Sequence, residues 1–243
     1  MKYKVRCSSF STLLGGCGKV RNCLEWNDID NWNEAHIKLA IEIYNHTEGI
    51  FTPAEITTLD MSAGNENESD TVKLYDEFFG TNYFTDYEIS RSVTQKFNKS
   101  NDYLTGSRDF GNDVKTIDAK CSTDKNVFDA KKFVPLETDY IIQQNGYSLL
   151  YGTPELELYN ALMPATFGQI KKFTDNKAYI EMLSDTEKDE YQFKLEDNYS
   201  YQFLPLSKRI SVREIPLIDG FSEIVKKRVT ILNNWIESNK HKL

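Results

Sequence analysis

The amino-acid sequence predicts an α/β fold in which a central mixed β-sheet is flanked by α-helices. Segments with apolar residues at helical spacing occur near both ends of the chain, and a segment of alternating apolar and polar residues, Val114–Cys121, lies between them. No Pro-, Gly- or Ser-rich linker divides the 243 residues, of which 40% are hydrophobic. We therefore expect a single domain, 1–243, with a substantial core.

The first part of the chain predicts helices. Apolar residues recur at helical spacing in Asn33–Asn45. Thr52–Pro53–Ala54–Glu55 combines a capping box with a proline at the first helical position, which is typical of a helix start. The stretch Ser62–Phe79 predicts the next helix.

The middle of the chain predicts three strands and one helix. The strands are expected at Tyr83–Ser90, Tyr103–Asp109 and Val114–Cys121. Gly111–Asn112–Asp113 is the expected turn between the last two, because these residue types favour tight turns. On the helix expected at Tyr140–Leu150, Gln143 and Tyr147 lie four residues apart and share a face.

The last third predicts strands followed by a helix. The strands are expected near Ala178–Leu183, Tyr201–Leu204 and Ile210–Ile215. The acidic stretch Asp185–Asp197 is expected to be a hairpin or a solvated loop. The terminal helix, about Asp219–Ser238, has apolar residues at near-helical spacing and should cover one face of the core.

The net charge of −8 argues against a protein that coats nucleic acid, since such a protein needs a basic surface. A nuclease is not excluded, because metal ions offset the charge of their carboxylate ligands and a local basic strip can still hold phosphates. Four basic clusters are candidates for this strip, although for each cluster alone a solvated face is the favoured interpretation. The clusters are Lys131–Lys132, Lys171–Lys172, Lys208–Arg209 with Arg213, and Lys226–Lys227–Arg228.

Segments that span membranes or direct secretion are not expected. No run approaches the roughly 18 apolar residues of a membrane span, and no apolar region follows the basic residues of Met1–Cys7. We therefore expect a cytoplasmic protein. The four cysteines, which form no C-x-x-C pair, are expected to be reduced thiols.

Two acids and a lysine are spaced as a phosphodiester-cutting metal site requires. If Val114–Cys121 is a strand, alternation places Thr116, Asp118, Lys120 and Ser122 on one face. Asp118, together with Asp109 from the preceding strand, would form an oxygen site suited to Mg²⁺. The ammonium group of Lys120 would then orient a water and stabilise charge on the phosphate.

A G-x-x-D turn at Gly106–Asp109 followed by a strand reading Asp118–Ala119–Lys120 resembles the PD-(D/E)xK nuclease superfamily. Asp139–Tyr147 is similar to the helix that follows this motif in the YqaJ and lambda-exonuclease branch, which includes RecB-like nuclease domains. Gly64–Glu68 resembles the G-x-x-x-E helix of that branch. The second glutamine position of the later helix is Asn145, which departs from the pattern.

The resemblance implies a restriction-endonuclease-like core at about 60–165, between a helical part at about 1–80 and C-terminal strands and a helix at about 166–243. The implied metal ligands are Glu68, Asp109, Asp118 and the carbonyl of Ala119. They would hold Mg²⁺, for which Mn²⁺ can substitute, with two ions in each site. Lys120 and Gln143 complete the implied catalytic set. The candidate substrate-binding residues are Arg108, Ser122, Lys131, Lys132 and Tyr147.

The resemblance favours a DNA exonuclease that acts on duplex ends in phage-type recombination, with a single-strand annealing protein as partner. The expected assembly is a homo-oligomer, with a trimeric ring that encloses the duplex as its expected form. An endonuclease of the restriction or repair type is the alternative, as is a non-catalytic protein of the same fold that binds DNA or a partner. Asp113 competes with Asp109 as the first acid, but it lies in the expected turn.

Overall fold

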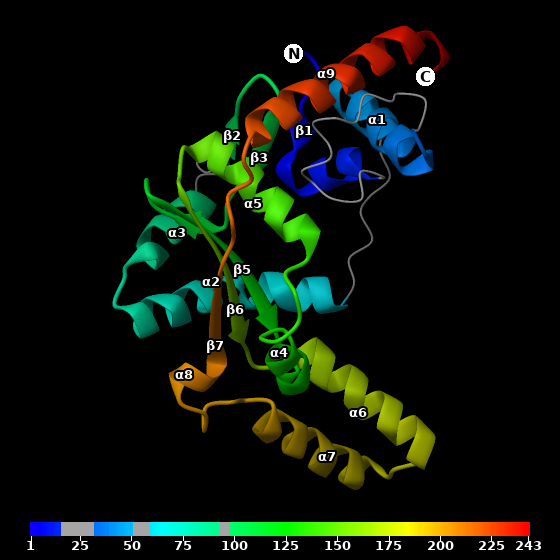
Figure 1. Cartoon of the computed structure of the whole chain (residues 1–243). Coiled ribbons are helices and arrows are strands. Elements are labelled where there is room, and N and C mark those ends of the chain that lie inside the picture. Colours follow the sequence, from blue (N-terminus) through cyan, green and yellow to red (C-terminus); the bar gives the residue numbers. More distant parts are fainter. Residues whose placement is uncertain (16–31, 51–58, 93–97) are drawn as a thin grey trace.

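The computed structural model describes residues 1–15, 32–50, 59–92 and 98–243 (Figure 1). Its centre is a four-stranded mixed sheet of order β4-β5-β6-β7, in which β5 and β6 run parallel and the outer pairs are antiparallel. The strands are β4 (Phe110–Gly111), β5 (Lys115–Ser122), β6 (Glu155–Leu162) and β7 (Ile210–Glu214). The expected α/β fold with a mixed sheet flanked by helices is confirmed.

A second, three-stranded sheet lies beside the first and has the order β1-β3-β2. Its strands are β1 (Val5–Arg6), β2 (Asn98–Ser100) and β3 (Leu104–Ser107). β1 pairs parallel with β3, and this pairing brings the N-terminus beside the segment that leads to Asp109. The short connection after β3 therefore links the two sheets at the point where the first candidate acid lies.

Helices cover both faces of the central sheet. On one face, α2 (Leu59–Phe79) and α3 (Tyr83–Ser92) pack on a core that contains Phe110, Ile117 and Tyr159. On the other face, α5 (Thr138–Tyr151) packs over Leu156 and Leu158. Because side chains alternate along β5, its residues 117, 119 and 121 enter the first core, and residues 116, 118, 120 and 122 face the side of α5.

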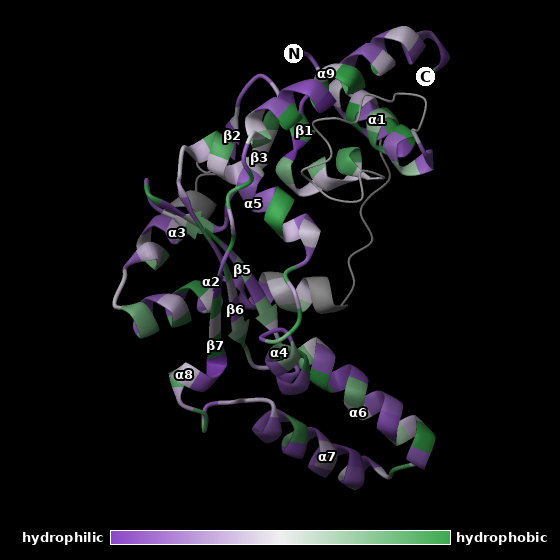
Figure 2. Ribbon diagram, viewed as in Figure 1, coloured by the Kyte–Doolittle hydropathy of each residue, from purple (hydrophilic) through white to green (hydrophobic). Residues whose placement is uncertain are grey.

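The largest core cluster lies beside the smaller sheet, at the top of Figure 1. It joins η1 (Cys7–Leu14), α1 (Glu34–Thr47) and α9 (Phe221–Asn239) to one side of α5. In α9 the buried residues recur at intervals of three and four, as in an amphipathic helix, and Figure 2 shows hydrophobic and hydrophilic positions alternating along it. A short η3 (Lys240–Lys242) ends the chain.

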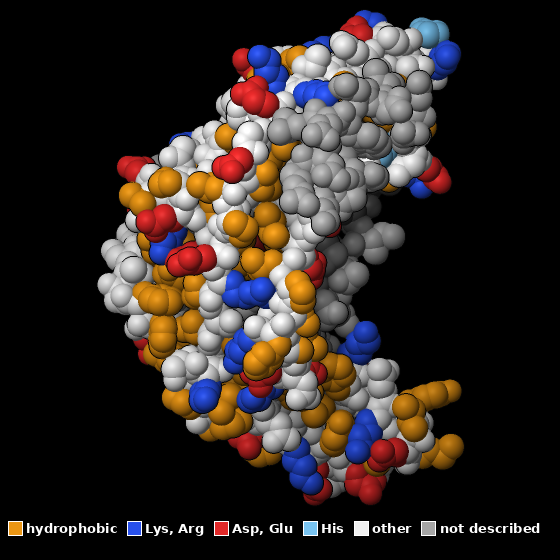
Figure 3. All heavy atoms as spheres, viewed as in Figure 1, with side chains coloured by type: hydrophobic (Ala, Val, Ile, Leu, Met, Phe, Trp, Pro, Cys, Tyr) orange, Lys and Arg blue, Asp and Glu red, His pale blue; other side chains and the backbone are white. Residues whose placement is uncertain are grey.

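The remaining helices lie beyond the carboxyl ends of β5 and β6. They are α4 (Lys125–Ala130), α6 (Phe167–Glu181), α7 (Asp185–Asn198) and α8 (Leu206–Arg209). α6 and α7 form an antiparallel hairpin that projects at the bottom of Figure 1. Figure 3 shows that the outline is concave between this hairpin and the upper helices.

Most helices and the central strands agree with the sequence-based prediction, with ends that shift by a few residues. The expected helices 33–45, 62–79, 140–150 and 219–238 correspond to α1, α2, α5 and α9, and the strands expected at 114–121 and 210–215 correspond to β5 and β7. The expected turn between β4 and β5 is confirmed, since the Asn112 side chain accepts hydrogen bonds from the backbone N–H groups of Val114 and Lys115.

Four predictions were wrong. Tyr83–Ser90 is helical because Asp76, from the end of α2, accepts hydrogen bonds from the N–H groups of Tyr83 and Phe84 and so caps α3 from outside its own sequence. Ala178–Leu183 is the end of α6 and the residues that follow it, and Tyr201–Leu204 is a turn. The acidic stretch 185–197 is α7, which begins with a capping box between Ser184 and Glu187.

Some expectations fall outside the described residues, namely the helix start at Thr52–Glu55 and the cysteines Cys17 and Cys23. The two described cysteines, Cys7 and Cys121, are free thiols. Burial raises the pKa of the Cys7 thiol to about 12. In the described part of the chain, none of the helices has the length and apolar character that crossing a membrane would require.

Candidate active site

The candidate site is centred on Asp118 and Lys120 of β5, which face the side of α5. The Asp118 side chain is buried, and its Oδ2 lies 2.6 Å from Nζ of Lys120, whose side chain is 29% exposed. The Lys120 ammonium also lies 5.3 Å from the centre of the Tyr140 ring on α5. Burial alone would lower the pKa of Lys120, but the charges of Asp118 and Asp109 outweigh it and raise that pKa. Lys120 is therefore held as a cation.

Asp109 lies in the connection between β3 and β4 and is joined to β5 by a hydrogen bond. Its Oδ2 accepts a 2.7 Å hydrogen bond from the N–H of Ala119. Burial, and then the charge of Asp118, raise the pKa of Asp109 to about 7, although Lys120 and the Ala119 N–H act in the opposite direction. Two carboxyl groups thus repel each other beside one ammonium group.

Glu68 lies on α2, and its charge contributes to the raised pKa of Asp109. It is half-buried. Among the residues that the structure describes, however, no group of three or more His, Cys, Asp or Glu side chains could hold a metal ion. The closely placed acids are therefore the pair Asp109 and Asp118.

The donors at this pair fit Mg²⁺. Carboxylate oxygens are hard ligands, and Mg²⁺ commonly takes one or two carboxylates and completes its shell with waters and substrate phosphates. A cation between Asp109 and Asp118 would also offset the repulsion that raises the pKa of Asp109. The carbonyl of Ala119 belongs to the residue between Asp118 and Lys120 and is a further candidate ligand.

Gln143 and Tyr147 reach the site from α5. Gln143 Nε2 donates to Asp118 Oδ1 at 3.4 Å and to the Tyr147 hydroxyl at 3.0 Å. Gln143 therefore contacts the acid of the motif. Asn145, at the departure from the resembled pattern, points elsewhere: its side chain bonds to the carbonyls of Ile141 and Pro216 and to the N–H of Ile218.

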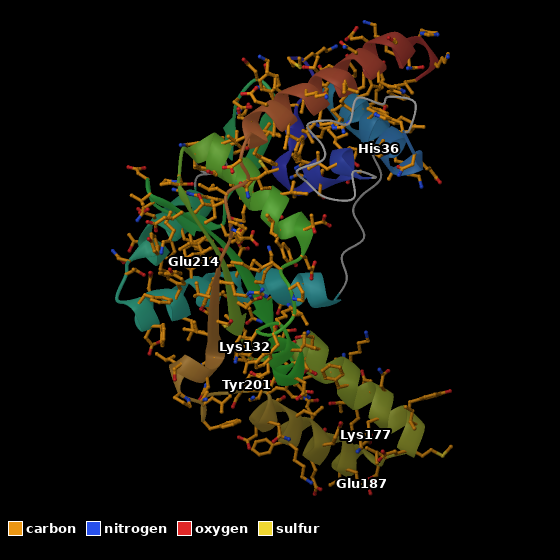
Figure 4. The ribbon with its side chains drawn as sticks, in the orientation of Figure 1. His36, Lys132, Lys177, Glu187, Tyr201 and Glu214 are labelled. Carbon is orange, nitrogen blue, oxygen red and sulfur yellow. The ribbon has the colours of Figure 1, made fainter. Side chains whose placement is uncertain are left out.

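Of the candidate substrate-binding residues, Ser122 and Lys131 lie together. The Ser122 hydroxyl accepts a 3.3 Å hydrogen bond from Nζ of Lys131. Lys132 instead pairs with Asp129 at 2.7 Å, and Figure 4 places it beside α4. The structure does not bring Arg108 to the acidic pair: its side chain is nearly buried and donates to the Asn112 carbonyl at 2.7 Å.

A cavity of about 920 Å³ lies between the N-terminus, α1 and β3, and it was not anticipated from the sequence. Lys4, Arg6 and Lys38 bring three positive charges to its lining and Glu42 one negative charge, and Tyr147 connects it to the candidate site. The lining includes Lys4, Arg6, Ser8, Lys38, Ser107 and Tyr147. A signal was present, because the basic residues Lys4 and Arg6 alternate with the buried residues Tyr3, Val5 and Cys7, which is the pattern of a segment with one polar face.

Comparisons with solved structures identify the fold. A phage-related exonuclease from Haemophilus somnus 129PT matches with a TM-score of 0.67 and 20% identity, covering 98% of this chain and 96% of that one. An alkaline exonuclease, LHK-Exo from Laribacter hongkongensis, matches with a TM-score of 0.59 and 14% identity, covering 98% and 92%. The chain has the fold of these exonucleases.

LHK-Exo in complex with dAMP shows the same likeness, with a TM-score of 0.59 and 15% identity. No protein-family model and no curated protein matches the sequence. Because the likeness covers nearly the whole of each chain, the exonuclease fold includes the α6–α7 hairpin and the upper helices as well as the central sheet.

Proposed function

We propose that this protein is a Mg²⁺-dependent DNA exonuclease that hydrolyses phosphodiester bonds from duplex ends. The observation that carries the proposal is the arrangement of Asp109, Asp118 and Lys120 within one exonuclease fold. The two acids and the ammonium lie on adjacent backbone segments, tied by the Asp109–Ala119 hydrogen bond and the Asp118–Lys120 ion pair.

In the proposed reaction, Asp109, Asp118 and the Ala119 carbonyl would hold Mg²⁺. Glu68 would contribute through a water, because among the described residues it does not form a group of three metal-binding side chains with the two aspartates. When bound, the metal lowers the pKa of a coordinated water and polarises the phosphate. Lys120 remains a cation beside the acids and stabilises the negative charge that develops on the phosphoryl oxygens.

Gln143 supports this arrangement from α5. Its amide nitrogen contacts both Asp118 and the Tyr147 hydroxyl, so it limits the positions that the Asp118 carboxylate can take. Such a constraint favours catalysis, because ligands held in one orientation need little reorganisation during the reaction.

The basic cavity supports a substrate that carries phosphates. Lys4, Arg6 and Lys38 line it, and Tyr147 places it next to the acidic pair. Phosphate contacts supply most nonspecific affinity for DNA, so a local group of cations can hold a strand although the whole chain carries a charge of −8. The complex of LHK-Exo with dAMP is consistent with a nucleotide substrate for this fold.

Partners and assembly extend the proposal. We infer a homo-oligomer, with a trimer as the expected form, and a role in phage-type recombination beside a single-strand annealing protein. Enclosure of the duplex by several subunits would give processivity to an acidic chain that lacks a broadly basic surface.

The test compares linear and covalently closed circular duplex DNA, with and without Mg²⁺, for the parent and for Asp118→Asn. We expect the linear DNA to be degraded only with metal, the closed circle to stay intact, and the variant to be inactive. Cleavage of the closed circle would identify an endonuclease. Stable binding of DNA by the parent without cleavage of either form would identify a non-catalytic protein of this fold.

A further inference from the structure

A large aromatic side chain is displayed to solvent at the border of the candidate active site. Phe133 is 86% exposed and lies in the loop 131–137, which joins α4 to α5. Val134 and Pro135, which follow it, are also exposed. A single exposed apolar residue is ordinary. Three in succession in one loop form a small apolar surface that suggests a contact.

The first residue of this loop, and a residue of α5 just beyond the loop, contact the strand that carries Asp118 and Lys120. At its start, Nζ of Lys131 lies 3.3 Å from the Ser122 hydroxyl on β5. Beyond its end, the Tyr140 ring lies 5.3 Å from the Lys120 ammonium. The loop therefore borders the active-site face of β5, and Phe133 is exposed in the turn with which it begins.

The loop is held in place by hydrogen bonds from the sheet. Arg213 on β7 donates through Nη1 to the carbonyls of Lys131, at 3.0 Å, and Val134, at 2.7 Å. The N–H of Phe133 donates to the Ala130 carbonyl at 3.0 Å. The backbone on both sides of Phe133 is thus fixed, so a ligand that packs on the ring has little loop entropy to overcome.

We propose that Phe133 is a substrate-binding residue on which a base of the DNA end stacks while the adjoining phosphate lies at Asp109, Asp118 and Lys120. This inference rests on the proposed nuclease function. The ammonium group of Lys131 extends from this loop to Ser122 on β5. There it can pair with a phosphate of the DNA strand whose terminal base stacks on Phe133. Any of the four bases can stack on an aromatic ring, which suits an enzyme that must remove nucleotides whatever their sequence.

The test uses Phe133→Ala and Phe133→Trp, with Phe193→Ala as the matched control, because Phe193 on α7 is also exposed, at 73%. Loss of one base–aromatic contact should raise KM for linear duplex DNA by about 5- to 100-fold. The Trp variant should restore most of the loss, and the control should match the parent. Because the altered side chains are exposed, the unfolding temperatures should not change.

An abasic nucleotide at the DNA end removes the base from the same contact. If the base stacks on Phe133, the abasic substrate should raise the KM of the parent to about that of Phe133→Ala with the normal substrate. It should not raise the KM of Phe133→Ala any further. Equal additional losses in the parent and the variant would overturn the proposal, as would an unchanged KM for Phe133→Ala. The apolar surface of Phe133, Val134 and Pro135 would then be a contact for a protein partner.

Binding separates this proposal from the proposed catalysis. Fluorescence anisotropy of end-labelled duplex, with Ca²⁺ in place of Mg²⁺, measures affinity without turnover. Binding that depends on Phe133, in a parent protein that never cleaves DNA, would retain the stacking contact and refute the nuclease function. Cleavage together with binding that is independent of Phe133 would support the nuclease function and refute the stacking contact. A parent protein that neither binds nor cleaves DNA would refute both.

Discussion

Replacement of Asp109 by asparagine should remove a pH-dependent destabilisation of the metal-free protein. The asparagine keeps an oxygen that can accept the hydrogen bond from the Ala119 N–H, but it cannot become an anion beside Asp118. Asp113 lies four residues away in the β4–β5 turn and was the alternative candidate for the first acid of the motif. Asp113→Asn is therefore the matched control.

The expected size follows from the pKa of Asp109, which rises from an ordinary 3.8 to about 7 in the folded chain. A group whose pKa is raised by folding contributes stability below its unfolded pKa, and that stability is lost as the pH rises through the folded pKa. Between about pH 4 and pH 7 the free energy of unfolding of the parent should therefore fall by on the order of 2–4 kcal/mol more than that of Asp109→Asn.

Urea denaturation in EDTA at a series of pH values measures this difference. At pH 8 the variant should be more stable than the metal-free parent, and added Mg²⁺ should stabilise the parent but not Asp109→Asn. The control Asp113→Asn should behave as the parent does. Parallel stability curves for the parent and Asp109→Asn, or equal stabilisation of both by Mg²⁺, would refute the assignment of Asp109 to a metal site.

Four further outcomes are expected. Lys120→Ala should lower the cleavage rate by about 10²–10³-fold while DNA-end binding survives, whereas Asp118→Ala should lose cleavage and Mg²⁺ binding together, as rate measurements and metal titrations will show. Ca²⁺ should support cleavage poorly and EDTA should abolish it in a gel assay. Asn145→Ala should cost about 2–3 kcal/mol in denaturation while kcat of the folded fraction stays unchanged. Light scattering should show an oligomer, and a processive monomer would contradict that expectation.

The elements around the candidate site were predictable because their signals are local. On β5, strict alternation separates the buried Ile117 from Asp118 and Lys120 on the opposite face, and it needs no distant partner to be recognised. The turn before β5 was predictable for the same reason, since the Asn112 side chain bonds to backbone groups two and three residues ahead.

The errors fall where distant contacts decide the structure. α3 reads as a strand by alternation, but the Asp76 carboxylate at the end of α2 caps it as a helix. The α6–α7 hairpin has little apolar periodicity, and its anchor to the sheet is made by Gln169 and Tyr201, which both bond to Thr123 after β5. The basic cavity joins Lys4 and Arg6 to β3 across about one hundred residues. It depends on the pairing of β1 with β3 and on α1, which forms another part of its lining.

The departure at Asn145 is explained by the geometry of α5. Successive helical residues are rotated by about 100°, so Gln143 and Tyr147 share one face, and Asn145 points to the opposite side. Gln143 and Tyr147 accordingly meet at the site with Asp118, while the Asn145 amide joins α5 to the backbone of Pro216 and Ile218, between β7 and α9. The Asn145 side chain therefore fixes the position of the helix that carries Gln143 and Tyr147. A different side chain at position 145 changes how the helix is held, but it does not change the groups that face Asp118.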